Sequence, residues 1–384
     1  MSPLNLSYPV DARGTFPDRV RLQLSFKVQA AFLAASTIII LLVLIARRAR
    51  RLVQKHGICE LLRSSPMHIF FLSLLCADLV EDMSSIMDAR WVHDALTVIQ
   101  GILEGTYCQI QAILRQSGGL GVALTILAIA VTTWGCLVKQ WSSPSPKVAA
   151  AVVASIWLFV ILMAVIGPAV HRSHPFYGST TYWCFIRMPY TLPGGIACFY
   201  AWVWTSAILN FLLYIWIVVK LLQLRRRPNS DQQSQQEKKL HKLALQMAWY
   251  PLVYFITVAP VSITRTWQFA KPNHPPSPIA TIMSGMAFDS SGFFNVILFS
   301  LTRPGIILGE APERTSFETF MTLTHITIPA GSNPATSSES RDTTLCPSTM
   351  SGMSSAESSL NSVKDSTPSR SRKSALSLDL HLPV

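Results

Sequence analysis

The chain has 384 residues, of which 50% are hydrophobic and only 14% are charged, and its formal net charge is +12. A soluble globular domain usually carries about 25% charged residues, so this composition argues against an ordinary soluble protein and for membrane spans. The positive charge suits anionic membrane lipids, and we expect no nucleic-acid partner.

Residues 1–25 form a polar leader that holds Asp11 and Arg13 and has no apolar core, so it does not read as a signal peptide. Asn5 begins the triplet Asn-Leu-Ser, which is a glycosylation site if the leader lies outside the cell.

Seven apolar runs follow, each near the roughly 20 residues that a membrane-spanning helix needs. They cover about 27–46, 66–88, 108–138, 148–168, 195–220, 243–264 and 277–301. Backbone groups in lipid must bond internally, so each run should be a helix. Short loops then force neighbouring helices to run antiparallel. The expected fold is an all-α membrane protein, a seven-transmembrane helix bundle within residues 26–304.

Lysine and arginine concentrate in the loops after the first, third and fifth spans, which places these loops in the cytosol. The N-terminus is then outside, the C-terminus is cytosolic, and we expect a multi-pass protein of the plasma membrane. The loop after the fifth span has basic clusters at both ends, which form either a solvated surface or a docking face for a cytosolic partner. These residues are Arg225, Arg226, Arg227, Lys238, Lys239 and Lys242.

This orientation also sorts the cysteines. Only Cys108, at the outer end of the third span, and Cys184, in the second outer loop, face an oxidising space, so we expect a disulfide between them. The tail, residues 305–384, becomes rich in serine and threonine and poor in aromatic residues, and we expect it to be mostly disordered.

The second span carries acids inside an apolar helix. Asp78, Glu81, Asp82 and Ser85 follow the spacing of a single helical face. Ionisable residues within a span are costly and usually face the bundle interior, where they have partners. Helical rise along the second, third and seventh spans places these and other polar residues in two layers. The outer layer holds Glu81, Asp82, Arg115, Gln116 and Asp289, and the deeper layer holds Asp78, Ser291 and Asn295.

Each layer has two interpretations. The outer layer is either an ion pair between Arg115 and an acid of the second span, or a ligand pocket with charged walls; its excess of acids also admits proton sensing. The deeper layer is either a hydrogen-bonded contact between helices or an activation switch. In the second case it would repack as the sixth span moves about Pro251 and Pro260.

Several protein classes lack support in the sequence. The seventh span has no lysine for a retinal Schiff base, and no hydrolase, metal-protease or phosphate-loop motif is present. We therefore expect no enzyme activity, no cofactor and no metal.

Three stretches carry a family resemblance. LSLLCAD, which ends at Asp78, resembles the second helix of G-protein-coupled receptors, and Trp157 stands where those receptors have their usual tryptophan. YPLVYFITVAPVSITR (250–265) and GFFNVILFSLTRP (292–304) resemble fungal receptors grouped with glucose-sensing and cAMP-receptor-like proteins. This resemblance implies a receptor for a small extracellular molecule, a nutrient or a cAMP-like compound, that activates a heterotrimeric G protein.

Two departures separate the chain from the large rhodopsin-like class. Thr132, Thr133 and Trp134 stand where that class has Asp-Arg-Tyr, and the seventh span has Asn-Val-Ile-Leu-Phe in place of Asn-Pro-x-x-Tyr. These departures favour the fungal cAMP-receptor-like group. The alternatives to a receptor are a seven-helix transporter or channel, whose charged layer would line the path, and a scaffold acting through its tail.

Overall fold

The computed structural model describes residues 16–56, 66–94, 105–139, 141, 144–171, 175–187, 190–225, 231–271 and 274–302. The chain divides into two compact units, Met1–Asn333 and Pro334–Val384, and all described residues belong to the first. The glycosylation site at Asn5 and the tail from residue 303 lie outside the described residues.

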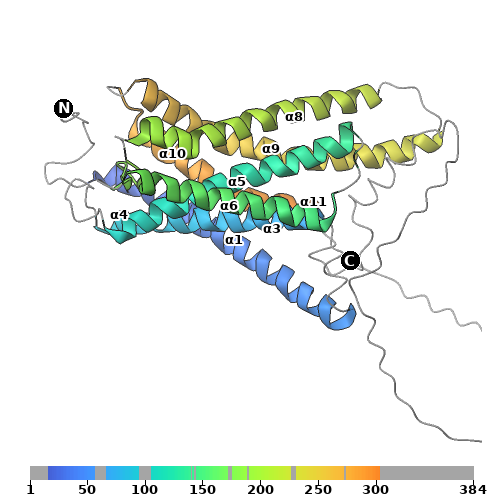
Figure 1. Ribbon diagram of the computed structural model, residues 1–384, viewed down its shortest axis with the longest axis horizontal. Helices are drawn as coiled ribbons and strands as arrows, with labels where there is room; N and C mark the ends of the chain where they lie inside the picture. Colours follow the sequence, from blue (N-terminus) through green and yellow to red (C-terminus); the bar gives the residue numbers. More distant parts are fainter. Residues whose placement is uncertain are drawn as a thin grey trace, which may run out of the picture. The chain divides into compact units, whose positions relative to one another are not determined.

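The described part of the chain forms seven rods (Figure 1). They are α1 (Asp18–His56), α3 (Pro66–Ile86), α5 (Thr106–Val138), α6 (Pro146–Val170), η1 (Thr191–Tyr200) with α8 (Ala201–Arg225), α9 (Asp231–Ala270), and α10 (Pro278–Asp289) with α11 (Ser291–Thr302). A short helix, α4 (Ala89–Asp94), follows α3. The expected seven-helix bundle is confirmed. The first rod begins at Asp18, inside the stretch that the sequence assigned to the leader.

Local sequence explains where several helices begin. Ser145 and Ser277 each precede a proline, and their side chains accept from the backbone N–H groups of Val148 and Ala280. A serine cap followed by proline in the first turn is a strong start signal for a helix.

Five of the described helical stretches are long and apolar enough to cross a membrane, judged by length and composition. The acids of α3 explain why it is not among them. Large apolar side chains are exposed along the outward faces of α6 and α8 and suit contact with lipid. They include Leu158, Ile161, Val165, Ile208, Phe211 and Leu212.

Helix α5 lies at the centre of the bundle, where it contacts α3, α6, α8 and α9 (Figure 1). At one end it also contacts a hairpin of β1 (Tyr177–Ser179) and β2 (Cys184–Ile186), which pair antiparallel. The expected disulfide between Cys108 and Cys184 is present and joins the hairpin to α5. The hairpin is an addition to the all-α fold expected from the sequence, because periodicity in the spans says nothing about a three-residue strand in a loop.

Two of the rods depart from regular α-helix. The fifth rod begins as a π-helix over Thr191–Tyr200, and the N–H of Ala201 bonds to the carbonyl of Ile196, five residues back. The seventh rod breaks at Ser290, between α10 and α11. The break separates Asp289 from Ser291, so it falls at the polar residues of this rod. Irregular helix at membrane depth is tolerated where it is buried in protein.

Gly118 sets the distance between α5 and α3. A Cβ atom added there would lie 2.5 Å from the backbone nitrogen of Glu81 and 2.7 Å from its Cα. We expect Gly118→Ala to push the helices apart and to lower the free energy of unfolding by about 1–3 kcal/mol. Thermal unfolding of detergent-solubilised protein measures this. Gly105→Ala is the matched control, because no atom lies within 4 Å of the added group; equal shifts for the two variants would contradict the close approach.

Candidate functional site

Four buried charged residues form a balanced network at the hairpin end of the bundle. Lys27 of α1 lies 2.6 Å from Asp88 Oδ2 and 2.9 Å from Asp289 Oδ2. Arg115 of α5 reaches the same Asp88 oxygen at 3.3 Å. The contact of Lys27 with Asp289 is a charge contact rather than a well-aligned hydrogen bond. Two cations thus neutralise two acids and tie α1, the end of α3, α5 and α10 together.

Neutral polar groups complete this network. Arg115 donates to Ser84 Oγ and Ser85 Oγ, and Ser85 in turn donates to Asp289. Gln111 of α5 donates to Asp88 Oδ1 at 2.5 Å. Buried charges are tolerated when they are both paired and hydrogen-bonded, and this network meets both conditions.

The partner of Arg115 differs from the expected one. The sequence placed Arg115 opposite Glu81 and Asp82, but the acid that it contacts is Asp88, one to two turns farther along. Both oxygens of Glu81 and one of Asp82 are buried without a hydrogen-bond partner among the described residues. The difference arises because Lys27, at the boundary between the expected leader and the first span, is buried in the bundle and pairs with both Asp88 and Asp289.

Trp183, beside the disulfide, closes the network from the hairpin side. Lys27 Nζ, Arg115 Cζ and Arg265 Cζ each lie 5.1 Å from its ring centroid. A cation over a tryptophan face is attracted by the ring quadrupole, more strongly where water is excluded. The hairpin therefore contributes one aromatic ring, that of Trp183, and basic side chains from three helices lie close to it.

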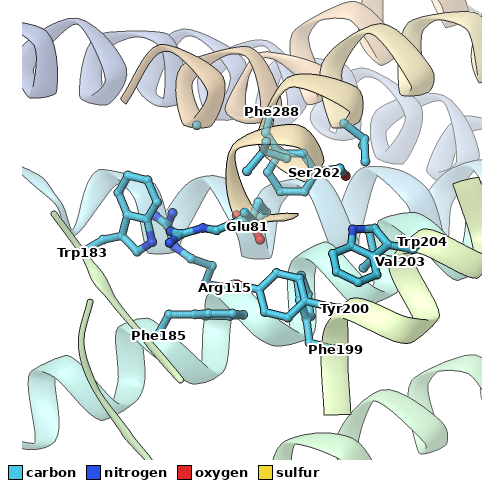
Figure 2. Close-up of a pocket in the computed structure, with 14 residues that line it drawn as sticks. Glu81, Arg115, Trp183, Phe185, Phe199, Tyr200, Val203, Trp204, Ser262 and Phe288 are labelled. Carbon is cyan, nitrogen blue, oxygen red and sulfur yellow. The ribbon is translucent and has the colours of Figure 1, made fainter. Parts of the chain in front are cut away.

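Beneath Trp183 lies a cavity of about 60 Å³. Its charged lining residues are Glu81, Arg115 and Arg265, and most of the others are aromatic or aliphatic. Figure 2 shows Glu81 near the middle of these side chains, between Arg115 and Phe288. The aromatic lining residues are Trp183, Phe185, Phe199, Tyr200, Trp204 and Phe288.

The structure distributes the expected outer-layer residues over four environments. Glu81 and Arg115 line the cavity, and Asp289 belongs to the ion network. Asp82 is buried but is not among the lining residues. Gln116 accepts from the hydroxyl of Tyr177 at 2.8 Å and so holds the hairpin against α5. Burial raises the pKa of that Tyr177 hydroxyl, which keeps it protonated as the donor.

The deeper layer is brought together as a contact between α3 and α11. Ser291 donates to Asp78 Oδ1 at 3.2 Å, and Asn295 donates to Asp78 Oδ2 at 2.8 Å. This contact begins at the first residue of α11, directly after the break at Ser290. Pro260 lies inside α9; Pro251 is also in that helix, but its side chain is outside the described residues. The same holds for the basic cluster side chains at residues 225–242.

Sequence reasoning missed Lys27, Asp88, Trp183 and Arg265. Asp88 continues the polar face of the second span, seven residues after Glu81, so helical spacing was a usable signal. Lys27 and Arg265 lie at the ends of apolar runs, where a basic residue normally extends toward water. No sequence signal placed Trp183 of the loop inside the bundle.

Comparison with known proteins identifies the family of the chain. Residues 58–295 match the sequence model of the seven-transmembrane receptors of the rhodopsin family. The chain belongs to this family. It is therefore a G-protein-coupled receptor and not an enzyme, and the transporter alternative is not favoured. The departures at residues 132–134 and in the seventh span, which we took to separate the chain from the rhodopsin-like class, do not prevent the match.

The receptor fold also agrees with a solved structure. Squid rhodopsin superposes with a TM-score of 0.55 at 16% sequence identity, over 85% of this chain and 99% of that chain. At this identity the similarity concerns the fold alone. No curated protein matches the receptor in sequence.

Proposed function

We propose that the cavity beneath Trp183 is the ligand site of this receptor and that it accepts a small polar molecule from outside the cell. The observation that carries the proposal is the convergence of buried charged side chains from three helices on one cavity, directly under the disulfide-linked hairpin. A concave site with mostly apolar walls and a few convergent polar groups is typical of small-molecule binding.

The orientation follows from the loop charges. With the basic loops in the cytosol, the hairpin and the cavity face the outside, and the receptor resides in the plasma membrane. By the same orientation, the loop that carries the basic clusters at residues 225–227 and 238–242 is cytosolic. There the basic residues would contact a heterotrimeric G protein. Because this contact relies on positive charge, the binding of the G protein should weaken as ionic strength rises.

Signal transfer would use the contact of Asp78 with Ser291 and Asn295. A ligand shifts a receptor toward one packing only by binding that packing more tightly. The cavity touches α9 at Val258 and Arg265 and α10 at Gly285. Movement of α9 about Pro251 and Pro260, with α11 pivoting at the break after Asp289, would carry the change to the cytosolic end.

The ligand class comes from the resemblance to fungal glucose-sensing and cAMP-receptor-like proteins, which suggests a nutrient or a cyclic nucleotide. Membranes carrying the receptor are expected to accelerate guanine-nucleotide exchange on a Gα subunit of the host when the ligand is added. Arg115→Ala should abolish that response to the ligand. Absence of accelerated exchange on every host Gα subunit, across a panel of sugars, amino acids and cyclic nucleotides, would refute the proposal.

A further inference from the structure

Two charged groups that line the cavity form no ion pair with any residue that the structure describes. Glu81 is 2% exposed, and neither of its carboxylate oxygens has a hydrogen-bond partner within the described part of the chain. Arg265 is 8% exposed; it donates to Gln268 at 2.8 Å and lies over Trp183, but no described acid forms an ion pair with it. A buried ion without a counter-ion is costly, and each such exception calls for an explanation.

The neighbouring charges do not fill this need. Lys27 and Arg115 are occupied by Asp88 and Asp289, two cations against two acids. Transferring Arg115 to Glu81 would remove one of the two cations on Asp88 and the bonds to Ser84 and Ser85. Among the residues that line the cavity, this leaves one acid, Glu81, and one cation, Arg265, outside the network. Asp82 also forms no ion pair with a described residue, but it does not line the cavity.

The walls of the cavity favour a cation near Glu81. Phe185, Phe199, Tyr200 and Phe288 line the cavity together with Glu81. In Figure 2, Phe288 is drawn near Glu81, and the other three rings lie farther away, on the side of Arg115. Aromatic faces beside an anion form a suitable environment for an ammonium group. The guanidinium of Arg265 is suited to a carboxylate, which it can bind through two parallel hydrogen bonds.

The volume limits the size of the occupant. Its volume of about 60 Å³ is enough for a few water-sized groups and favours a small occupant, such as a small amino acid. A neutral polyol would leave both buried charges without a counter-ion.

We infer that the cavity binds a small zwitterion, with the ammonium group at Glu81 among the aromatic rings and the acidic group at Arg265. The inference rests on the proposed ligand site and replaces its broad ligand class by a specific one. It requires no rearrangement of the ion network of Lys27, Arg115, Asp88 and Asp289.

The test is calorimetric titration of purified receptor in nanodiscs with the zwitterions glycine, alanine and β-alanine, which measures their dissociation constants. Alaninamide, which has only the cation, N-acetylalanine, which has only the anion, and glucose, which has neither, are the comparison ligands. We expect a zwitterion to bind more than about tenfold more tightly than all three. In Glu81→Gln, the zwitterion should no longer bind more tightly than N-acetylalanine. In Arg265→Gln, it should no longer bind more tightly than alaninamide.

Stability and signalling separate the possible failures. Glu81→Gln removes an unpaired buried charge, so the unliganded variant should unfold at the same temperature as the parent or higher. Zwitterion binding that neither substitution weakens, or binding of glucose alone, overturns the inference. If glucose or a cyclic nucleotide drives nucleotide exchange and no zwitterion binds, the inference fails while the proposed function stands. If a zwitterion binds as described but no Gα subunit responds, the inference stands and the proposed coupling fails.

Discussion

Asp88→Asn is expected to destabilise the receptor more than any other single charge change at the hairpin end. The substitution keeps the size of the side chain but removes the one acid in the described part of the chain that pairs with both Lys27 and Arg115. Breaking a buried ion pair by neutralising one partner typically costs about 3–5 kcal/mol, because the remaining charges stay buried. Thermal unfolding of the detergent-solubilised receptor, followed by the loss of its folded fraction, measures the effect.

Asp18→Asn is the matched control. Asp18 pairs with Arg21 at 3.7 Å on the surface, and its side chain is fully exposed, so its neutralisation should leave the unfolding temperature unchanged. A second variant separates charge from packing. Asp88→Asn leaves two cations, Lys27 and Arg115, with one acid, Asp289. Combining it with Lys27→Met leaves one cation and one acid, so this double variant should recover part of the lost stability. An unfolding temperature for Asp88→Asn equal to that of the control would show that the network contributes no stability.

The fold was largely predictable because membrane spans depend on length and polarity, which the sequence displays directly. Apolar runs located all seven rods, and α3 was found despite the acids at Asp78, Glu81 and Asp82. The hairpin and the break at Ser290 were not predicted. Both features depend on contacts with other helices, and the pattern of residues nearby in the sequence does not reveal such contacts.

The site was predictable only where helical geometry fixes the neighbours. Spacing and rise placed Asp78 at the level of Ser291 and Asn295, and the structure brings the three side chains into contact. The choice of partner for Arg115 was different. Several acids on the polar face of the second span compete for Arg115. Which acid pairs with Arg115 depends on Lys27 from another helix, and the burial of Lys27 has no signature in its local sequence. Because of this tertiary contact, the carboxylate of Glu81 has no ion-pair or hydrogen-bond partner among the described residues.

Loss of the Cys108–Cys184 disulfide is expected to weaken both the fold and the cavity. The bond links residues 76 apart in sequence and holds the hairpin that carries Trp183. Cys108→Ser or Cys184→Ser should lower the free energy of unfolding by about 2–4 kcal/mol. This loss of stability should be smaller than the loop-closure entropy of a fully flexible chain would predict. Transmembrane helices remain helical in the unfolded state in lipid, so the chain between the two cysteines never becomes a free coil.

The two cysteine variants must also be non-additive. Because each substitution removes the same bond, the double variant should be no less stable than the single ones, to within about 0.5 kcal/mol. Cys198→Ser is the control, since Cys198 is buried and free; its small effect should add to that of either variant. Ligand affinity should fall together with stability in the disulfide variants but not in Cys198→Ser, because only the former release Trp183 from Lys27, Arg115 and Arg265. Additive losses from the two cysteines would mean that each acts through its own packing and that the hairpin is held in place without the bond.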